Sequence, residues 1–235
     1  MKTVAIIPAA GTGTRMRTSR PKQFLSLAGS PIIIHTLRKF ALCQKIKEAI
    51  VPLRKSDMPQ FQEVLEKEGL SRFVRLVPGG THRQDSVYNG FKEIEEDTDV
   101  VVVHDAVRPF VEIELIEAVI QEALKSGSVI PAVPCVDTLK QIEKNQVVAT
   151  LPREKIVLVQ TPQAFQYKIL KEGLERAQAE HFYATDESCL IERLGYPVTV
   201  IRGSESNIKI TKPADLPFAD LLIQKERAQV SNVSV

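Results

Sequence analysis

Near the start of the chain, residues 4–16 read VAIIPAAGTGTRM. The first four residues form a short apolar run rich in β-branched side chains, which is typical of a buried strand. The small residues and glycines that follow let backbone N–H groups approach phosphate oxygens without interference from Cβ atoms. The stretch predicts a strand that ends in a candidate phosphate-binding loop, although the glycines alone fit an ordinary turn equally well.

The rest of the chain alternates between short β-branched runs and longer amphipathic segments. This alternation predicts an α/β fold with a mostly parallel, doubly wound (Rossmann-like) sheet that helices cover on both faces. After the strand at 4–7, we expect strands at 48–53, 73–77, 99–103, 129–133, 156–159 and 198–201. We expect helices at 31–42, 57–68, 83–95, 112–125, 167–179, 186–194 and 213–227, the first of them capped by Ser30 and opened by Pro31.

The pattern changes at residues 137–151, where two strand-like runs flank residues 143–146, EKNQ. This arrangement predicts a hairpin that projects from the sheet as a β-arm at about 136–153. A chain of 235 residues fits one α/β domain with a full core. We therefore expect a single domain over residues 1–228 and a short frayed tail at 229–235.

The composition is that of an ordinary globular protein, with 43% hydrophobic and 26% charged residues. A formal net charge of only +2 argues against a nucleic-acid binder, which would concentrate far more Lys and Arg. No stretch approaches the roughly 18 apolar residues that a membrane span needs. Cys43, Cys135 and Cys189 are odd in number and far apart, which favours free thiols in a reducing compartment. We therefore expect a cytoplasmic protein.

The first loop does not match two familiar nucleotide-binding patterns. A dinucleotide fingerprint would need a third glycine where Met16 stands, and a P-loop would end in Gly-Lys-Ser/Thr. The loop is instead followed by cations, Arg15 and then Lys22, whose backbone is constrained by Pro21. Such cations are ordinarily solvated surface charges, but a triphosphate with about four negative charges requires two or three of them beside a backbone nest.

A carboxylate is predicted close to this loop. The apolar strand that includes Val100–Val103 is followed by His104 and Asp105, and ligands bind beyond the carboxyl ends of such strands. Asp105 suits a Mg²⁺ ion, which takes one or two carboxylates together with phosphate oxygens and water. A helix-capping or loop aspartate is the alternative. For His104 we expect a hydrogen-bonded turn residue without a chemical role.

Several segments together indicate a family. They are PAAGTGTRM at 8–16, PKQ at 21–23, GGTHRQDSV at 79–87, HDAVRP at 104–109, TPQAF at 161–165, TDE at 185–187 and NIKIT at 207–211. In this order, over about residues 3–216, the chain resembles the 2-C-methyl-D-erythritol 4-phosphate cytidylyltransferases of the non-mevalonate isoprenoid pathway. The resemblance implies a nucleotidyltransferase-type fold and the transfer of CMP from CTP to a small polyol phosphate, with Mg²⁺ as cofactor.

The resemblance also implies site residues and an assembly. Arg15, Lys22 and Lys209 would act on the reacting phosphates. CTP would be bound by Pro8, Ala9, Ala10, Gly11, Gly13, Arg15, Lys22, Gly80, Thr81, Ser86, Asp105 and Ala106. The polyol phosphate would be bound by Asp105, Arg108, Thr138, Arg153, Thr161, Thr185 and Lys209, although strand propensity alone explains Thr138 and Thr161. The arm would cross to a partner subunit, giving a homodimer with shared sites.

One departure and two alternatives remain. The family commonly has an aspartate just before Asn-Ile-Lys, where this chain has Ser206 preceded by Glu205. Mg²⁺ would then be held by Asp105 alone, by Glu205 in addition, or mainly through CTP. The nearest alternatives are ribitol- and ribulose-5-phosphate cytidylyltransferases, but the segment TDES at 185–188 favours the methylerythritol enzymes over them. A non-catalytic CTP-binding module is disfavoured because Lys22, Asp105 and Lys209 are all present.

Overall fold

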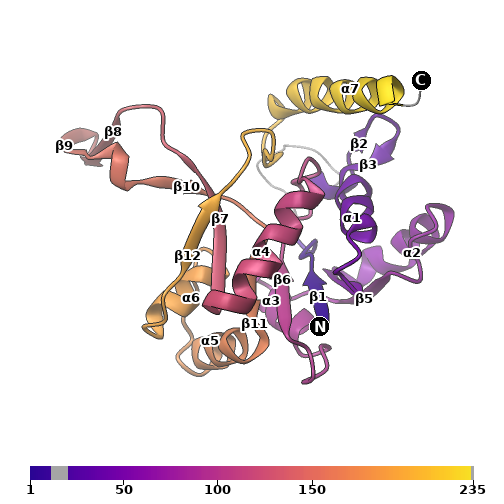
Figure 1. Ribbon diagram of the computed structural model, residues 1–235, viewed down its shortest axis with the longest axis horizontal. Helices are drawn as coiled ribbons and strands as arrows, with labels where there is room; N and C mark the ends of the chain where they lie inside the picture. The colour runs from indigo at the N-terminus through magenta and orange to yellow at the C-terminus, as the bar shows by residue number, and fades with distance from the viewer. Residues whose placement is uncertain (12–20, 234–235) are drawn as a thin grey trace.

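The computed structural model describes residues 1–11 and 21–233, with side chains as far as residue 228. Its body is built on a mixed sheet, from which a narrow arm projects (Figure 1). The strands described in this sheet are β1 (Thr3–Ile6), β4 (Glu48–Leu53), β5 (Val74–Pro78), β6 (Val100–Val103), β7 (Ser128–Pro134), β10 (Val157–Val159), β11 (Gln163–Gln166) and β12 (Thr199–Arg202).

The strand order is β10-β7-β11-β6-β1-β4-β5, and β12 lies beside β7. Strands β6, β1, β4 and β5 are parallel to one another, as are β7 and β12. Strand β11 runs antiparallel between β6 and β7, and β10 is antiparallel to β7. The mostly parallel sheet predicted from the sequence is confirmed, and the antiparallel β11 is an addition to it.

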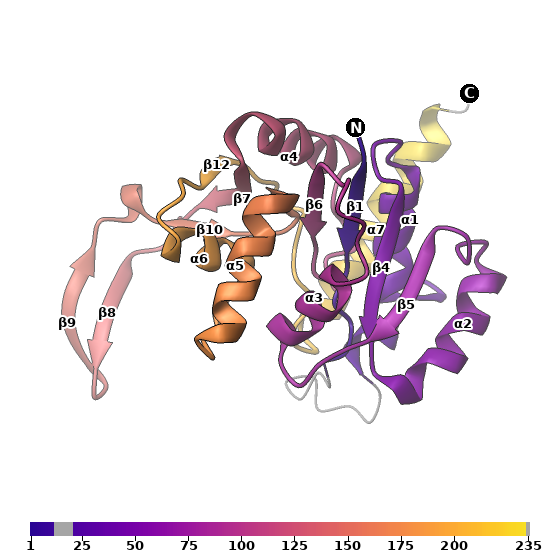
Figure 2. The same cartoon turned by 90° about the horizontal axis from the view of Figure 1, so that it is seen from below.

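Helices cover both faces of the sheet (Figure 2). They are α1 (Ile32–Leu42), α2 (Met58–Lys67), α3 (Arg83–Phe91), α4 (Ile113–Ser126), α5 (Tyr167–Ala179), α6 (Glu187–Arg193) and α7 (Asp215–Val233), with short 3₁₀ turns η2 (Lys22–Phe24), η3 (Lys55–Asp57) and η4 (Arg153–Lys155). Helices α1, α2 and α4 pack on one face, and α3, α5 and α6 pack on the other. The doubly wound arrangement is therefore confirmed.

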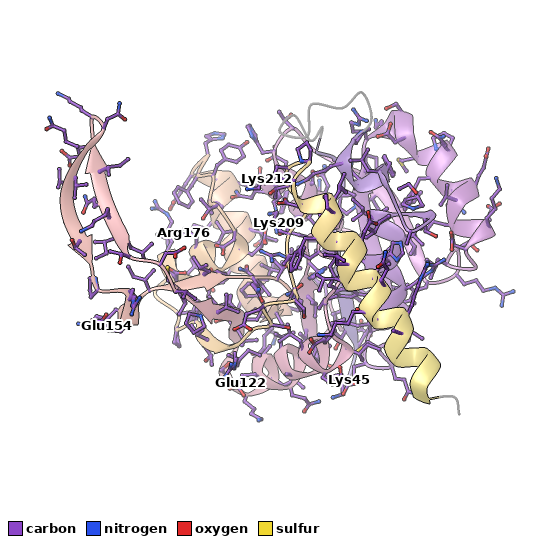
Figure 3. All side chains as sticks on the ribbon, turned by 90° about the horizontal axis from the view of Figure 1, so that it is seen from above. Lys45, Glu122, Glu154, Arg176, Lys209 and Lys212 are labelled. Carbon is purple, nitrogen blue, oxygen red and sulfur yellow. The ribbon has the colours of Figure 1, made fainter. Side chains whose placement is uncertain are left out.

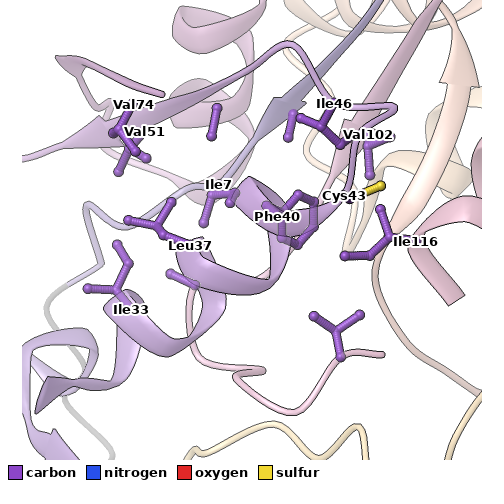
Figure 4. Close-up of a cluster of buried hydrophobic side chains, with 14 of the residues drawn as sticks. Ile7, Ile33, Leu37, Phe40, Cys43, Ile46, Val51, Val74, Val102 and Ile116 are labelled. Carbon is purple, nitrogen blue, oxygen red and sulfur yellow. The ribbon is translucent and has the colours of Figure 1, made fainter. Parts of the chain in front are cut away.

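The period of two along each strand explains the two-sided core. In β1, Ala5 packs toward α1 and α4, whereas Val4 and Ile6 pack toward α3 and α5. Figure 4 shows the first of these clusters, in which Leu37 and Phe40 of α1 lie against the sheet. Full burial of such a side chain contributes about 1.5–3 kcal/mol. The core therefore fixes the strand ends that carry the site.

Three predicted helix ends were wrong. Pro31 lies directly before the first residue of α1. Ser30 does not cap this helix, because the Ser30 hydroxyl donates to Glu68. Ser30 and Pro31 instead form β3 (Ser30–Pro31), which is paired with β2 (Ser26–Leu27). Helix α3 ends at Phe91 instead of continuing to 95, because the N–H groups of Glu93 and Ile94 donate to the carbonyls three residues earlier, those of Gly90 and Phe91, in tight turns. Helix α7 continues to Val233, whereas the sequence predicted a helix end at 227.

The arm is the predicted hairpin. Strands β8 (Leu139–Glu143) and β9 (Gln146–Leu151) form a separate two-stranded sheet. Lys144 and Asn145 connect them with φ of 46° and 64°, the double positive φ that a tight hairpin turn requires. The arm exposes the large apolar side chains of Val136, Ile142, Val147 and Val148. Among the described residues, no helix is long and apolar enough to cross a membrane.

Candidate active site

A cavity of about 310 Å³ lies at the carboxyl ends of β1 and β6. The loop after β1 forms one wall, and the side chain of Gln23 holds this loop from behind. Gln23 is buried, and its Nε2 donates to the carbonyls of Ala9 (2.5 Å) and Gly11 (3.2 Å). The amide fixes the backbone, which leaves Pro8–Gly11 facing the cavity. Gln23 lies in the PKQ segment, but no role was predicted for its side chain.

The loop before α3 forms the opposite wall. Gly79 and Gly80 allow a close approach here, because a Cβ on Gly79 would lie 2.3 Å from the Ala10 Cβ and one on Gly80 would lie 2.2 Å from the Asp85 Cβ. The Gly80 N–H donates to Ser86 Oγ at 3.0 Å. Gly80, Thr81 and Ser86 all line the cavity. The structure therefore brings this segment, three residues of which were predicted to bind CTP, against the first loop.

Asp105 is the acidic centre of the cavity. Its Oδ1 accepts from Arg83 Nε at 3.2 Å, while its Oδ2 lies 2.8 Å from Lys209 Nζ and 3.5 Å from Arg108 Nε. Burial alone would raise the pKa of Asp105, but Arg83, Lys209 and Arg108 hold that pKa well below its usual range. Asp105 is therefore ionised throughout the neutral pH range.

Residues 207–211 bring Lys209 to this carboxylate. Arg108 Nη1 donates to the Asn207 carbonyl at 2.7 Å, and Asn207 Nδ2 donates to the Thr161 carbonyl at 2.8 Å. Lys22 Nζ lies 3.5 Å from the Ile210 carbonyl, so both lysines line one cavity. Figure 3 shows Lys209 on the segment that leads into α7.

His104 and Thr161 support Asp105 from behind. The Asp105 N–H donates to Thr161 Oγ1, which lies 3.0 Å from His104 Nδ1, and His104 Nε2 lies 3.1 Å from the Arg108 carbonyl. The carbonyl can only accept, so Nε2 carries the proton and Nδ1 accepts from Thr161. Burial lowers the pKa of His104 to about 4, so the ring is neutral. The prediction of a hydrogen-bonded His104 is confirmed. The Thr161 hydroxyl, which was predicted to bind the acceptor, instead bonds to His104 and Asp105.

Arg83 and Glu187 were missed as site residues, although both lie in quoted motifs. Arg83 lines the cavity, and its Nη1 donates to both carboxylate oxygens of the buried Glu187, at 2.7 and 2.9 Å. Burial raises the pKa of Glu187, and Arg83 opposes this effect. Arginine is usually a surface residue, so no local pattern indicated this buried pair.

Other predicted residues lie elsewhere. Thr138 and Arg153 are exposed at the base of the arm, where Arg153 Nη1 donates to the Val136 carbonyl, and Thr185 is exposed before α6. None of these three lines the cavity of its own subunit as far as the described residues define it. Gly13 and Arg15 lie outside the described residues.

The lining of the cavity fits a metal ion that is bound mainly by the phosphate oxygens of a nucleotide. Asp105 is the single carboxylate among the described lining residues, and these residues contain no cluster of three or more His, Cys, Asp or Glu side chains that could hold a metal. One carboxylate completed by phosphate oxygens and water matches the preference of Mg²⁺. Glu205 is exposed, and Ser206 Oγ bonds to Ser204 and Glu112, so neither belongs to the described lining.

A cation-lined crevice at the carboxyl ends of parallel strands, with a small-residue loop as one wall, defines a nucleotide-binding α/β protein of the nucleotidyltransferase type. The family model described as 2-C-methyl-D-erythritol 4-phosphate cytidylyltransferase matches residues 3–225. The chain belongs to this family.

Individual relatives agree along the whole chain. The 2-C-methyl-D-erythritol 4-phosphate cytidylyltransferase of Solibacter usitatus is 44% identical, over 97% of this chain and 98% of the relative. That of Bacillus velezensis is 43% identical, over 96% and 97%. A crystal structure of 4-diphosphocytidyl-2C-methyl-D-erythritol synthase from Anaerococcus prevotii matches with a TM-score of 0.84 and 34% identity, over 95% of this chain and 96% of that one. The corresponding cytidylyltransferase structure from Thermus thermophilus has a TM-score of 0.80 and 33% identity, over 95% and 100%.

Proposed function

We propose that this chain transfers CMP from CTP to 2-C-methyl-D-erythritol 4-phosphate, giving 4-diphosphocytidyl-2-C-methyl-D-erythritol and pyrophosphate in isoprenoid precursor synthesis. The observation that carries the proposal is one cavity in which Lys22, Lys209 and Asp105 meet the loop at Pro8–Gly11. The family of the chain supports the same reaction. The free thiols of Cys43, Cys135 and Cys189 fit a cytoplasmic enzyme.

The chemistry is a displacement at phosphorus. An oxygen of the acceptor's phosphate forms a bond to the α-phosphorus of CTP, while the bond from that phosphorus to the oxygen bridging to the β-phosphate breaks. The electron pair of the broken bond leaves with pyrophosphate. The nucleophile is already an anion, so no general base is needed, and catalysis reduces to positioning and charge neutralisation.

The lysines act where charge develops. Lys22 follows the first loop and Lys209 lies beside Asp105, so the two ammonium groups approach the triphosphate from different segments of the chain. Both stabilise the α-phosphate and the leaving pyrophosphate. Asp105 holds Lys209 in place through their 2.8 Å ion pair. Asp105 would hold Mg²⁺ together with phosphate oxygens, and the ion would supply charge that neutralises the triphosphate.

The second proposal concerns assembly. The arm exposes Val136, Ile142, Val147 and Val148, and β10 exposes Leu158. Exposed apolar residues concentrated on a projecting arm indicate a protein interface. We infer a homodimer in which a two-fold axis places each arm, with Thr138 and Arg153 at its base, against the acceptor side of the other subunit's site.

Pyrophosphate release from each nucleoside triphosphate, with either methylerythritol phosphate or ribitol 5-phosphate as acceptor, tests the reaction. We expect turnover with CTP and methylerythritol phosphate, and much slower turnover with ATP or GTP. A preference for ribitol 5-phosphate would mean that the proposed acceptor is wrong. CTP binding without product for any acceptor would make the chain a nucleotide-binding module.

A further inference from the structure

The proposed reaction leaves one buried carboxylate without a role. Glu187 is the first residue of α6 and is only 1% exposed, yet its two oxygens both accept from Arg83 Nη1. A buried ion pair adds little stability over a well-packed apolar pair, because desolvation offsets most of the attraction between the charges. Stability alone therefore does not explain Glu187, and its partner Arg83 leads to the cavity.

Arg83 is held from two sides. Glu187 binds its Nη1, while Asp105 accepts from its Nε at 3.2 Å, so the orientation of the planar guanidinium is fixed. The remaining nitrogen, Nη2, makes no hydrogen bond to any residue in the described part of the chain. Arg83 lines the cavity, and 31% of its side chain is exposed. A fixed cation with spare N–H donors at a cavity is suited to a ligand oxygen.

The hydrogen bonds of the neighbouring residue Gln84 indicate the side of the cavity on which Arg83 lies. Gln84, its neighbour in α3, donates through Nε2 to the Phe182 carbonyl at 2.8 Å and accepts from the Ala184 N–H at 2.9 Å. These bonds attach residues 182–187, which include Thr185, to the first turn of α3. Arg83 therefore lies between Asp105 and the segment that carries Thr185, which the resemblance assigns to the acceptor although Thr185 does not itself line the cavity.

We propose that Glu187 is a positioning residue, which holds the Arg83 guanidinium against Asp105 so that Nη2 donates to an oxygen of the acceptor polyol phosphate. The inference rests on the proposed function, because the acceptor is part of it. Glu187→Gln keeps the size of the side chain but removes its charge, so Arg83 loses its stronger anchor. The kcat/KM for the acceptor should fall about 10-fold or more, the effect of one charged hydrogen bond, with little change in CTP affinity.

A double-mutant cycle of Glu187→Gln and Arg83→Gln separates positioning from packing. Each single variant should lose both melting temperature and activity, because one charge is left without its partner. The double variant should regain melting temperature and remain as inactive as Arg83→Gln alone. The control is Glu180→Gln, which removes an exposed carboxylate paired with Arg193 at 2.8 Å and should leave kcat/KM unchanged.

Three results would overturn the inference: activity that returns together with melting temperature in the double variant, full activity of Glu187→Gln, or CTP binding weakened as much as acceptor binding. Calorimetric titration with CTP provides the last measurement. An inactive unmodified chain would contradict the proposed function and this inference with it. An active unmodified chain with any of the three results contradicts the inference alone.

Discussion

Asp105 gathers three cations around one carboxylate, and Lys22 lines the same cavity. The described lining residues therefore carry more positive than negative charge, which suits a triphosphate before any metal binds. The three cations lie at different distances from Asp105 and make different further contacts. Lys209 and Arg83 are within hydrogen-bond reach of Asp105, whereas Arg108 at 3.5 Å uses its Nη1 to hold residue 207. Arg108 therefore adds positive charge near Asp105 and also fixes the segment that carries Lys209.

Replacing Lys22 by Ala removes a charge beside the predicted position of the α-phosphate. We expect kcat to fall about 10²-fold or more, as for loss of an oxyanion-stabilising donor, with a smaller change in CTP affinity. Steady-state kinetics together with CTP titration separate the two effects. Lys168→Ala is the matched control, because this exposed lysine of α5 lies near the amino end of β6, at the opposite edge of the sheet from the cavity. A rise in KM with kcat unchanged would mean that Lys22 only binds CTP.

Replacing Asp105 by Asn keeps the shape of the side chain but removes the charge that pairs with Arg83 and Lys209 and that would hold Mg²⁺ in the proposed reaction. Activity should collapse and the dependence on Mg²⁺ concentration should weaken, while the circular dichroism spectrum stays that of the folded protein. Ordinary turnover at ordinary Mg²⁺ would instead assign Asp105 the role of a structural cap.

At the scale of elements, the order of strands and helices followed from hydrophobic period, because each strand alternates between two covered faces. Strand β11 did not follow from it. It is four residues long with glutamine at both ends, and the buried Gln163 is tolerated because it bonds to Asp186 and to the Ser188 N–H. Such compensation comes from α6, about 20 residues away, and local sequence does not contain it.

Part of the candidate site could likewise be predicted from local sequence, and part could not. The first loop, Gly80, Ser86 and Asp105 were found because motifs mark them and strand ends converge. Arg83 and Glu187 were missed because their roles depend on helices α3 and α6 beginning at the same point in space. Whether the arm residues Thr138 and Arg153 enter a site depends on a second subunit, which no property of a single chain's sequence specifies.

The contact between the first loop and the segment before α3 can be tested with two glycines. Gly79→Ala places a Cβ 2.3 Å from that of Ala10, so the two walls must separate. We expect a lower melting temperature and weaker CTP binding. Gly11→Ala meets nothing within 4 Å among the described atoms, so melting temperature should be kept while its Cβ hinders the approach of phosphate. Equal melting temperatures for the two variants would contradict this account.

At the scale of the whole molecule, the body and the arm are built differently. The body has apolar clusters on both faces of its sheet, whereas β8 and β9 are almost entirely exposed. An isolated two-stranded hairpin is marginal in water. We therefore expect the arm to need the partner surface of the proposed dimer for its order, and we expect that dimer to form before the acceptor side of each site is complete.

Mixing two inactive variants tests the shared site. Lys22→Ala and Arg153→Ala should each be nearly inactive alone. After subunit exchange, each mixed dimer has one site that lacks both residues and one intact site. With random exchange, activity should recover to about a quarter of that of the unmodified enzyme. No recovery, once mixed dimers have been verified by mass spectrometry, would place Arg153 in its own subunit's site.

The separate pairing of β8 with β9 also affects how such a protein can diversify. In the described part of the chain, these strands bond only to each other and share no register with the sheet that holds the cavity. Substitutions along the hairpin can therefore change which subunits associate without moving Asp105 or the first loop. In the proposed dimer, subunit recognition could therefore change while the phosphoryl chemistry is retained, as long as Thr138 and Arg153 are kept. Two homologues in one cell could then lose the ability to form hybrids while both remain active.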